Sequence, residues 1–466
     1  MYDDYGDGDD YMDDEYYDNK HIVWGGGGSS DTDALLDEYE NFSELADPRL
    51  LYSNCLLPTF ETAGLQLAET LALCAVYKVV LSQSAISSNV LYRNCVNLLV
   101  GLTVLYRYFA DLVVYIAVYS LCLLLLVALV RRHNQAFLIM LIVSIATITG
   151  CELLLPSFIL IRSVFMLMSI KVLSLLIDMK SNLPGSFDML AYLFNPGTVL
   201  FGPFVSYKQF LDSMEKPAPL SVNRIAKYIA LTAFFLAATC AVMPLPTGNL
   251  RLAFVYRDAL NFRVSHYFIS YMSLVTYAVC GYSEEDSALF SPLDIELPYS
   301  LKQVTYAWNR PLSHFLNRYI FKTHAATSRN VFLSLFLTYI VSCGLHGFNL
   351  YISQILLSLA VYSYIEYGLR AKLAHSLNAC VRAVRCPSEC SEHEHTALNS
   401  RVILLNGLFL VCNVFHLAYL GCVLNNLDLY AEDPDYKLDW IPARWSNMGY
   451  ASPYIVFAMY IVYIVL

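Results

Sequence analysis

The sequence contains a series of apolar runs that are each long enough, or nearly so, to cross a lipid bilayer. A transmembrane helix needs about 20 apolar residues, because the hydrocarbon core is about 30 Å thick. Backbone amides and carbonyls find no water in that core, so spanning segments are helices or closed barrel strands, and these lengths favour helices. We expect about eleven transmembrane helices among residues 65–81, 112–130, 136–155, 158–177, 228–242, 331–345, 350–364, 402–423 and 453–466, with weaker candidates at 95–109, 189–205 and 264–281.

The composition supports an all-α polytopic membrane protein. Hydrophobic residues make up 57% of the chain and charged residues only 15%, whereas soluble domains carry about 25% charged residues. Most of the thirteen cysteines lie inside apolar runs, where we expect them to pack as small apolar side chains rather than as disulfide partners. Examples are Cys74, Cys122, Cys240, Cys343 and Cys412.

Residues 1–50 differ in character from the rest of the chain. The first twenty hold nine acidic side chains and one lysine, so we expect a disordered, solvated tail, with binding to a basic partner as the alternative. This tail lacks the basic segment that opens a signal peptide, so an early apolar run would direct the chain to the membrane. Residues 51–466 are expected to form one transmembrane domain.

Several segments between the apolar runs predict other features. Two cations in "VRRHNQ" (130–135) indicate a cytosolic loop, and the Pro- and Gly-rich "NPGTVLFGPFVSYKQF" is expected to be buried in protein or to line a cavity. Residues 297–365 contain no Asp or Glu. Within them, "VTYAWNRPLSHFLNRYIFKTH" is expected to form a helix at the membrane interface. Its cations, Arg310, Arg318 and Lys322, are candidates to bind the phosphates of a ligand or anionic lipid headgroups.

His346, in "VSCGLHGFNL", is the main candidate for chemistry. No residue between Arg329 and Glu366 carries a formal charge, and Gly344 and Gly347 flank the histidine. Ionisable groups inside a membrane are costly and mark functional sites by default, and glycines allow a helix break and a close approach of a ligand. The alternative is a histidine that makes a structural hydrogen bond at the helix break.

Four further residues are weaker candidates. Asn309 lies in "AWNRPL" between Trp308 and Arg310, where an amide can also act as a helix cap without any role in chemistry. Trp308 and Ser342 are candidate substrate-binding residues. His416, in "FHLAYLG", is another histidine in an apolar run, and a structural hydrogen bond is the simpler explanation for it.

The segment "CVRAVRCPSECSEHEH" gathers possible metal ligands between two long apolar runs. Thiols and imidazoles at this density are able to hold structural zinc, although the spacing matches no standard zinc finger. A local disulfide and free or lipid-modified thiols are the alternatives. The candidate ligands are Cys380, Cys386, Cys390, His393 and His395.

The pairing of "GLHG" with an upstream "AWN" resembles the membrane-bound O-acyltransferase superfamily. Longer strings, among them "LDIELPYSLKQVTYAWNRPLSHFLNRYIFK" and "LHGFNLYISQILLSLAVYSYIEYGLRAKL", resemble the branch of that superfamily that attaches a lipid to Wnt proteins. The resemblance covers nearly all of residues 50–466 and excludes the acidic tail. The sequence has no GxSxG motif of a serine hydrolase.

The resemblance implies a fold, a site and a reaction. The fold would be a helical bundle around a central tunnel, with interfacial and re-entrant helices. His346 would be the catalytic histidine, with Asn309 as its polar partner. The reaction would move a palmitoleoyl group from its CoA thioester to a serine of a Wnt or Wingless protein, in the endoplasmic reticulum membrane. Acyl-CoA would be the co-substrate and membrane lipids the surroundings, with no cofactor and no nucleic acid.

Physical reasoning about His346 agrees with this chemistry. A serine hydroxyl is a poor nucleophile, and a neutral histidine in low-dielectric surroundings is able to take its proton as it attacks the thioester. Three alternatives stay open: a transporter or proton channel, an acyltransferase for lysophospholipid or sterol, and a scaffold that binds Wnt lipid without chemistry. Transporters show paired repeats and acidic residues along the path, and neither is evident in this sequence.

Overall fold

A computed structural model describes residues 48–83, 89–180, 182–242, 244–245, 250–283, 289–328, 330–387, 390–424, 445–446 and 448–466. The predicted acidic tail lies outside these residues, except for its last three, which begin helix α2 (Pro48–Leu51). The described residues are almost entirely helical, and their only β-type contact is an isolated bridge between Ala379 and His395.

Eleven helices of fifteen residues or more dominate the described part of the chain. They are α3 (Leu57–Ser82), α5 (Val90–Phe109), α6 (Val113–Val130), α7 (Ala136–Leu154), α8 (Phe158–Asp178), α11 (Val222–Val242), α12 (Arg251–Val279), α17 (Val331–Leu345), α18 (Leu350–Ser376), α19 (Ser400–Gly421) and α21 (Ala451–Val465).

Six described stretches are long and apolar enough to cross a membrane by length and composition, one of them joining α5 to α6. Helices α17 and α21 are apolar but shorter. Helices α12 and α18 are longer but carry buried charged side chains, such as Arg257 and Arg370. The prediction of an all-α polytopic membrane protein is confirmed.

Short helices connect the long ones. They are α2, η1 (Tyr52–Leu56), η2 (Ala110–Leu112), α9 (Ser186–Leu193), α10 (Tyr207–Glu215), α13 (Pro292–Glu296), α14 (Leu301–Trp308), α15 (Arg310–Phe315), η4 (Leu316–Phe321), α16 (Lys322–Ala325) and η5 (Cys422–Leu424). The predicted interfacial helix is thus a chain of four short helices, α14 to α16, that is interrupted at Asn309.

The weak candidate span at residues 189–205 is wrong. Helix α9 ends at Leu193, and the following residues are irregular because Pro196 and Gly197 break the helix. This segment is buried nonetheless. Lys171, on α8, is completely buried and donates to the carbonyl of Tyr192 and the hydroxyl of Thr198, at 3.0 Å each. A lysine inside the helix bundle therefore caps the last turn of α9 and ties the irregular segment to α8 through the side chain of Thr198.

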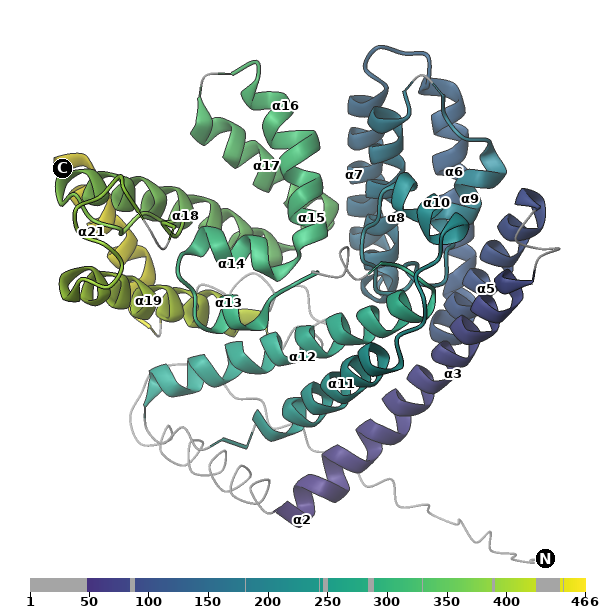
Figure 1. The fold of residues 1–466 in the computed structure, drawn as a ribbon, viewed down its shortest axis with the longest axis horizontal. Helices are drawn as coiled ribbons and strands as arrows, with labels where there is room; N and C mark the ends of the chain where they lie inside the picture. Colours follow the sequence, from purple (N-terminus) through teal and green to yellow (C-terminus); the bar gives the residue numbers. More distant parts are fainter. Residues whose placement is uncertain are drawn as a thin grey trace, which may run out of the picture.

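The helices form two groups that α12 bridges (Figure 1). Helices α3 to α8 lie on the right of the picture, and α18, α19 and α21 on the left, with α12 in contact with α3, α11 and α19. The right-hand group holds most of the buried apolar core. Its packing includes the rings of Tyr119 and Phe165, stacked at 4.1 Å between α6 and α8.

A disulfide joins η1 to α11 through Cys55 and Cys240. The prediction that Cys240 packs as a free apolar side chain is therefore wrong. Length and polarity of a run do not reveal which helices become neighbours, and Cys55 lies 185 residues away in the sequence. The remaining described cysteines are free, as predicted for Cys74, Cys122, Cys343 and Cys412.

Candidate active site

His346 lies at the end of α17, in the tight turn that leads into α18. The amide of Phe348 donates to the carbonyl of Cys343 at 2.8 Å, and the amide of Gly347 to that of Gly344 at 2.9 Å. These two bonds close a helix in the Schellman arrangement, which needs a left-handed residue after the cap. Gly347 supplies it with φ +74°, and Phe348 follows at φ 50°. The predicted helix break is confirmed.

The two glycines of the motif have separate packing roles. A Cβ on Gly344 would lie 2.8 Å from Ile145 of α7, so α17 approaches α7 more closely there than a larger residue allows. A Cβ on Gly347 would lie 3.2 Å from the Cβ of Glu152. The turn that carries His346 is therefore pressed against the last two turns of α7.

A polar group fixes this turn to the α7–α8 hairpin. Glu152, near the end of α7, accepts from Arg162 of α8 at 2.6 Å and from the side-chain amide of Asn349 at 3.1 Å. Asn349 also caps the start of α18 through the amide of Ile352. The ion pair is mostly buried, so it holds the turn in one position rather than fluctuating in water.

The imidazole of His346 is partly exposed. Among the described residues its ring has no hydrogen-bond partner, and Arg162 lies within electrostatic range of it. A histidine that held the helix break by a structural hydrogen bond would have a partner there. The ring is instead available to an incoming group, which is what a general base requires.

Asn309 ends α14 and caps α15. Its side-chain oxygen accepts from the amide of Leu312 at 3.1 Å, so the capping role foreseen for this residue is present. Because the oxygen is occupied by the cap, the side-chain NH₂ group points elsewhere, and it has no partner among the described residues. Asn309 lines a cavity of about 70 Å³, together with Ser163, Met166, Leu167, Ile170, Leu200, Phe201, Gly202, Pro203, Phe204 and Leu312.

Helix α8 passes both candidates, although His346 is not among the residues that line the cavity at Asn309. The cavity next to Asn309 is lined by α8 from Ser163 to Ile170, and His346 lies near Arg162, one residue before that stretch. Helix α8 is therefore the element that the histidine and the asparagine, 37 positions apart in the sequence, have in common. The irregular segment 200–204 also lines this cavity.

Trp308 and Arg310 flank Asn309 in the sequence and were predicted to bind substrate. Each of them contacts another side chain of the protein. The indole of Trp308 stacks on the ring of His266 at 4.1 Å. Arg310 lies 3.6 Å from Asp294, and its buried Nε has no hydrogen-bond partner in the part of the chain that the structure describes. Neither residue is among those that line the cavity beside Asn309, so their predicted role stays a prediction.

The cations of this segment are not in an acid-free environment. Arg318 donates to Asp178, at the end of α8, at 2.8 Å, and Asp178 also accepts from Tyr319. The sequence of 297–365 contains no acids, but the fold supplies them from α8 and α13. Lys322 is exposed and is the cation of the predicted three that forms no ion pair within the described residues.

Ser342 and His416 lie in separate places. Ser342 is buried one turn before His346, and its carbonyl accepts the histidine's amide at 3.1 Å. His416 is buried among α18, α19 and α21, where its Nδ1 pairs with the hydroxyl of Ser452 at 2.7 Å. This is the structural hydrogen bond foreseen as the alternative for His416, and nothing in the described residues connects its ring to the site at His346.

The start of α14 is fixed by a buried ion pair on α18. Glu366 accepts from the amide of Leu301 at 2.7 Å and from Arg370 at 3.2 Å. Asn413 of α19 donates to the same carboxylate at 3.0 Å. A buried pair needs such additional partners to offset its desolvation. Helix α14, which ends at Asn309, is thus anchored to α18, which begins just after His346.

Four of the five predicted metal ligands come together in the loop between α18 and α19. Cys380, Cys386, Cys390 and His393 offer ligand atoms that all lie within 4.8 Å of one another. The hydrogen bond with His393 lowers the pKa of the Cys390 thiol to about 7, and burial raises the pKa of Cys380. The ring of His395 is not part of this group. Its main chain pairs with Asn378 and Cys380 instead.

The sequence did not identify the group of Glu152, Arg162 and Asn349. Glu152 and Arg162 are opposite charges at the facing ends of two predicted spans, 136–155 and 158–177, that share a short loop. Charges at that depth in a helical hairpin are costly unless paired. This signal would have been enough to predict the ion pair, although the prediction was not made. No signal in the sequence connects them to Asn349, because that contact depends on how α17 packs on α7.

Comparison with known proteins gives one consistent result. The sequence matches the MBOAT, membrane-bound O-acyltransferase family, over residues 55–383. It is 30% identical over 461 residues to "Protein-serine O-palmitoleoyltransferase porcupine" of Homo sapiens, covering 89% of this chain and 96% of that protein. The protein of the same name in Mus musculus is 29% identical over the same shares. That of Drosophila melanogaster is 32% identical over 339 residues, 65% of this chain and 64% of that protein. This multi-pass membrane protein belongs to the membrane-bound O-acyltransferase family and is an acyltransferase.

Proposed function

We propose that this chain is a protein-serine O-palmitoleoyltransferase that transfers a palmitoleoyl group from its CoA thioester to a serine of a Wnt protein, in the endoplasmic reticulum membrane. The likeness to proteins named for this reaction, along nearly their whole length, supports the substrates. One observation supports the site. The imidazole of His346 and the side-chain NH₂ group of Asn309 both lack a hydrogen-bond partner among the described residues, and they lie beside adjoining parts of α8, Arg162 and Ser163–Ile170.

In this mechanism His346 is the general base. The serine hydroxyl attacks the thioester carbonyl as His346 takes its proton, so the new C–O bond forms while the carbonyl oxygen becomes negative. The C–S bond then breaks, and the proton passes from His346 to the departing thiolate of CoA. The products are an ester on the acceptor and free CoA, and the histidine returns to its neutral form.

Asn309 is the donor to the developing oxyanion. Its side-chain oxygen is engaged in capping α15, so only its NH₂ group is left to face the cavity. A donor held in place before the reaction stabilises the charge without further reorganisation. The cap therefore orients the amide, and the structural and chemical roles of Asn309 depend on each other.

The ends of the bundle suggest where each substrate enters. The loop between α6 and α7, which begins with Arg131 and Arg132, lies at the top of Figure 1, and α2, which leads into η1 and its disulfide of Cys55 with Cys240, lies at the bottom. Cations favour the cytosolic end of a bundle and disulfides an oxidising compartment, so the two features support the same orientation. Lys322 then faces the side on which acyl-CoA is made, and the His346 turn, at the far end of α17, faces the lumenal acceptor.

The test is transfer of an alkyne-tagged palmitoleoyl group from its CoA thioester to a Wnt-derived peptide, with the purified full chain in detergent. We expect tagged peptide with the native protein, none with a peptide whose acceptor serine is replaced by alanine, and none above background with His346→Ala. Each variant is first matched to the native protein in elution from gel filtration and in melting temperature.

Three other outcomes would contradict the proposal. Equal transfer by native protein and His346→Ala would make the histidine structural. Transfer to lysophospholipid or sterol in place of the peptide would identify a different acceptor class. Binding of tagged acyl-CoA without transfer to any acceptor would indicate a lipid-binding scaffold.

A further inference from the structure

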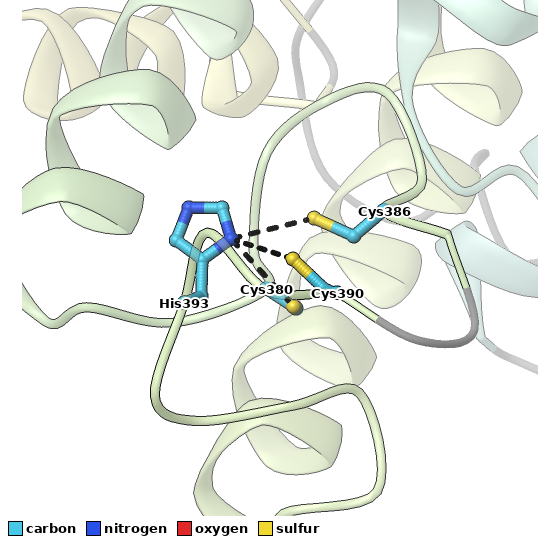
Figure 2. A group of neighbouring side chains, drawn as sticks. All are labelled: Cys380, Cys386, Cys390 and His393. Atoms are coloured by element: carbon cyan, nitrogen blue, oxygen red, sulfur yellow. Dashed lines mark hydrogen bonds between the residues drawn. The ribbon is translucent and has the colours of Figure 1, made fainter.

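The loop that joins α18 to α19 brings three thiols to one nitrogen atom. In Figure 2 the sulfurs of Cys380, Cys386 and Cys390 gather on the side of the His393 ring that carries Nδ1. The distances from Nδ1 to the three sulfurs are 3.7, 3.7 and 3.3 Å. Cys380 and His393 are buried, with 2% and 7% of their surface exposed.

These distances are those of a tetrahedral metal site. Zinc bonds are about 2.3 Å to sulfur and about 2.0–2.1 Å to a histidine nitrogen, so tetrahedral angles separate a sulfur from a nitrogen by about 3.6 Å. The measured separations surround that value. Three thiols and one imidazole are also a donor set that soft, tetrahedral zinc prefers, whereas calcium and magnesium need oxygen ligands.

We propose that Cys380, Cys386, Cys390 and His393 form a structural zinc site. All four positions around the metal are taken by protein, as in structural sites and unlike catalytic ones, which keep one position for water or substrate. The site takes no part in the chemistry of the proposed acyl transfer, since its residues lie at the opposite end of α18 from His346.

The zinc site lies next to a loop segment that contacts the residues just before α14. Its first two ligands bracket residues 381–385, and this arc holds the backbone just before α14. The hydroxyl of Ser300 donates to the carbonyl of Ala383 at 2.8 Å. Arg385 lies over the ring of Tyr299, with 5.0 Å between the guanidinium carbon and the ring centroid.

Arg370 connects the same arc to α18. It donates to the carbonyl of Val381 at 2.7 Å, and its guanidinium also bonds to the carbonyl of Tyr299. Fixing residues 381–385 therefore fixes both the N-terminal end of α14 and the buried pair of Glu366 and Arg370. Since α14 ends at Asn309, the zinc site is a support for the position of that residue.

Neither alternative for these thiols fits the geometry. The three cysteines are free in the structure, and each sulfur lies near Nδ1 of His393 as well as near the other sulfurs, so no two of them are singled out as a pair. An acyl chain on Cys380 has no room, since that thiol is buried against His393. A metal is the arrangement that uses all four side chains at once.

The first test is the metal content of the native full chain, purified without added metal and washed with a weak chelator, by inductively coupled plasma mass spectrometry. We expect about one zinc ion per chain. The variants Cys386→Ser and Cys390→Ser change partly exposed positions. Each is expected to contain at least about tenfold less zinc per chain than the native protein, because it lacks one of the four ligands.

Matched control variants distinguish the loss of a zinc ligand from a general loss of fold. Cys412→Ser removes a partly buried thiol of α19, and His395→Ala removes a histidine two positions from a ligand. Both are expected to keep the native zinc content. Cobalt(II) exchanged into the native protein should give the thiolate-to-cobalt absorption of a tetrahedral sulfur site, and this absorption should be missing from Cys386→Ser.

The proposal and the acyltransferase function fail separately. Native protein with less than about 0.1 zinc per chain, zinc retained in both cysteine variants, or iron in place of zinc would each overturn the metal site. So would mass spectrometry of the alkylated protein that shows a disulfide or an acyl group on Cys380, Cys386 or Cys390. Loss of peptide acylation with full zinc content would instead count against the proposed function alone.

Discussion

The two ends of α18 carry the same kind of side chain in opposite environments. At the N-terminal end, His346 lies in the four-residue turn between α17 and α18, pressed against α7, and its ring has no hydrogen-bond partner among the described residues. At the C-terminal end, His393 lies in a long loop and its Nδ1 faces three thiols. A histidine is suited to proton transfer when its ring nitrogens have no hydrogen-bond partner. It is suited to structural support when the side chains around its ring nitrogen are able to bind the same metal ion. Residue type alone did not separate these roles, whereas the neighbours do.

Replacing His346 with alanine is expected to abolish function at the N-terminal end of α18 and to leave the zinc site at the other end intact. General acid–base catalysis contributes about 10²–10⁴-fold to rates, so kcat for peptide acylation should fall by about that factor. Zinc content and melting temperature should stay at native values, because the ring makes no hydrogen bond within the described residues. A fall in zinc content together with activity would show that the two ends of α18 are not independent.

Variants of Asn309, the residue that follows α14, separate its role as a helix cap from its role as a donor to the oxyanion. In Asn309→Asp a carboxylate oxygen keeps the cap on Leu312, but the NH₂ donor is gone. Loss of one oxyanion donor costs about 10²–10³-fold in kcat, so this variant should be nearly as slow as Asn309→Ala while melting closer to native. If Asn309→Asp retained activity, the residue would be a cap and no more. Stopped assays of tagged peptide and intrinsic-fluorescence melting give the two readouts.

Gly347→Ala tests the tight turn. A left-handed residue other than glycine costs about 1–2 kcal/mol, and the added Cβ would meet Glu152 at 3.2 Å. We expect a lower melting temperature and reduced acylation. The control is Gly407→Ala on α19, where a Cβ meets nothing within 4 Å and alanine favours the helix by up to about 1 kcal/mol. A variant at 347 as stable as the one at 407 would refute the strained turn.

His395→Ala is expected to have the smallest effect. Its backbone bridges to Ala379, but alanine keeps that bridge, and surface changes away from special features stay within about 0.5 kcal/mol. Native melting temperature, zinc content and acylation should all be retained. A clear loss of zinc would add His395 to the ligands and require the loop to rearrange.

The sequence was sufficient for the helical class and for the break at His346, because long apolar runs and flanking glycines are local signals. It was also sufficient to gather the loop ligands, since they lie within sixteen residues. It failed where the result depends on which helices become neighbours. The pairing of Cys55 with Cys240 and the contact of Glu152 with Asn349 each join residues far apart in the chain. The acids beside Arg310 and Arg318 come from other helices for the same reason.

The register of α18 has a consequence for insertions and deletions. Sixteen residues, about 24 Å of helix, separate its first residue from Glu366, which holds the start of α14. One residue added or removed between them would shift Glu366 by about 1.5 Å and turn it by about 100° relative to the His346 turn. Glu366 would then no longer meet Leu301. We therefore expect the length of this half of α18 to tolerate no change in an active protein. The exposed residues Thr396 to Leu398, beyond the last zinc ligand and its neighbouring bridge, should accept added residues readily.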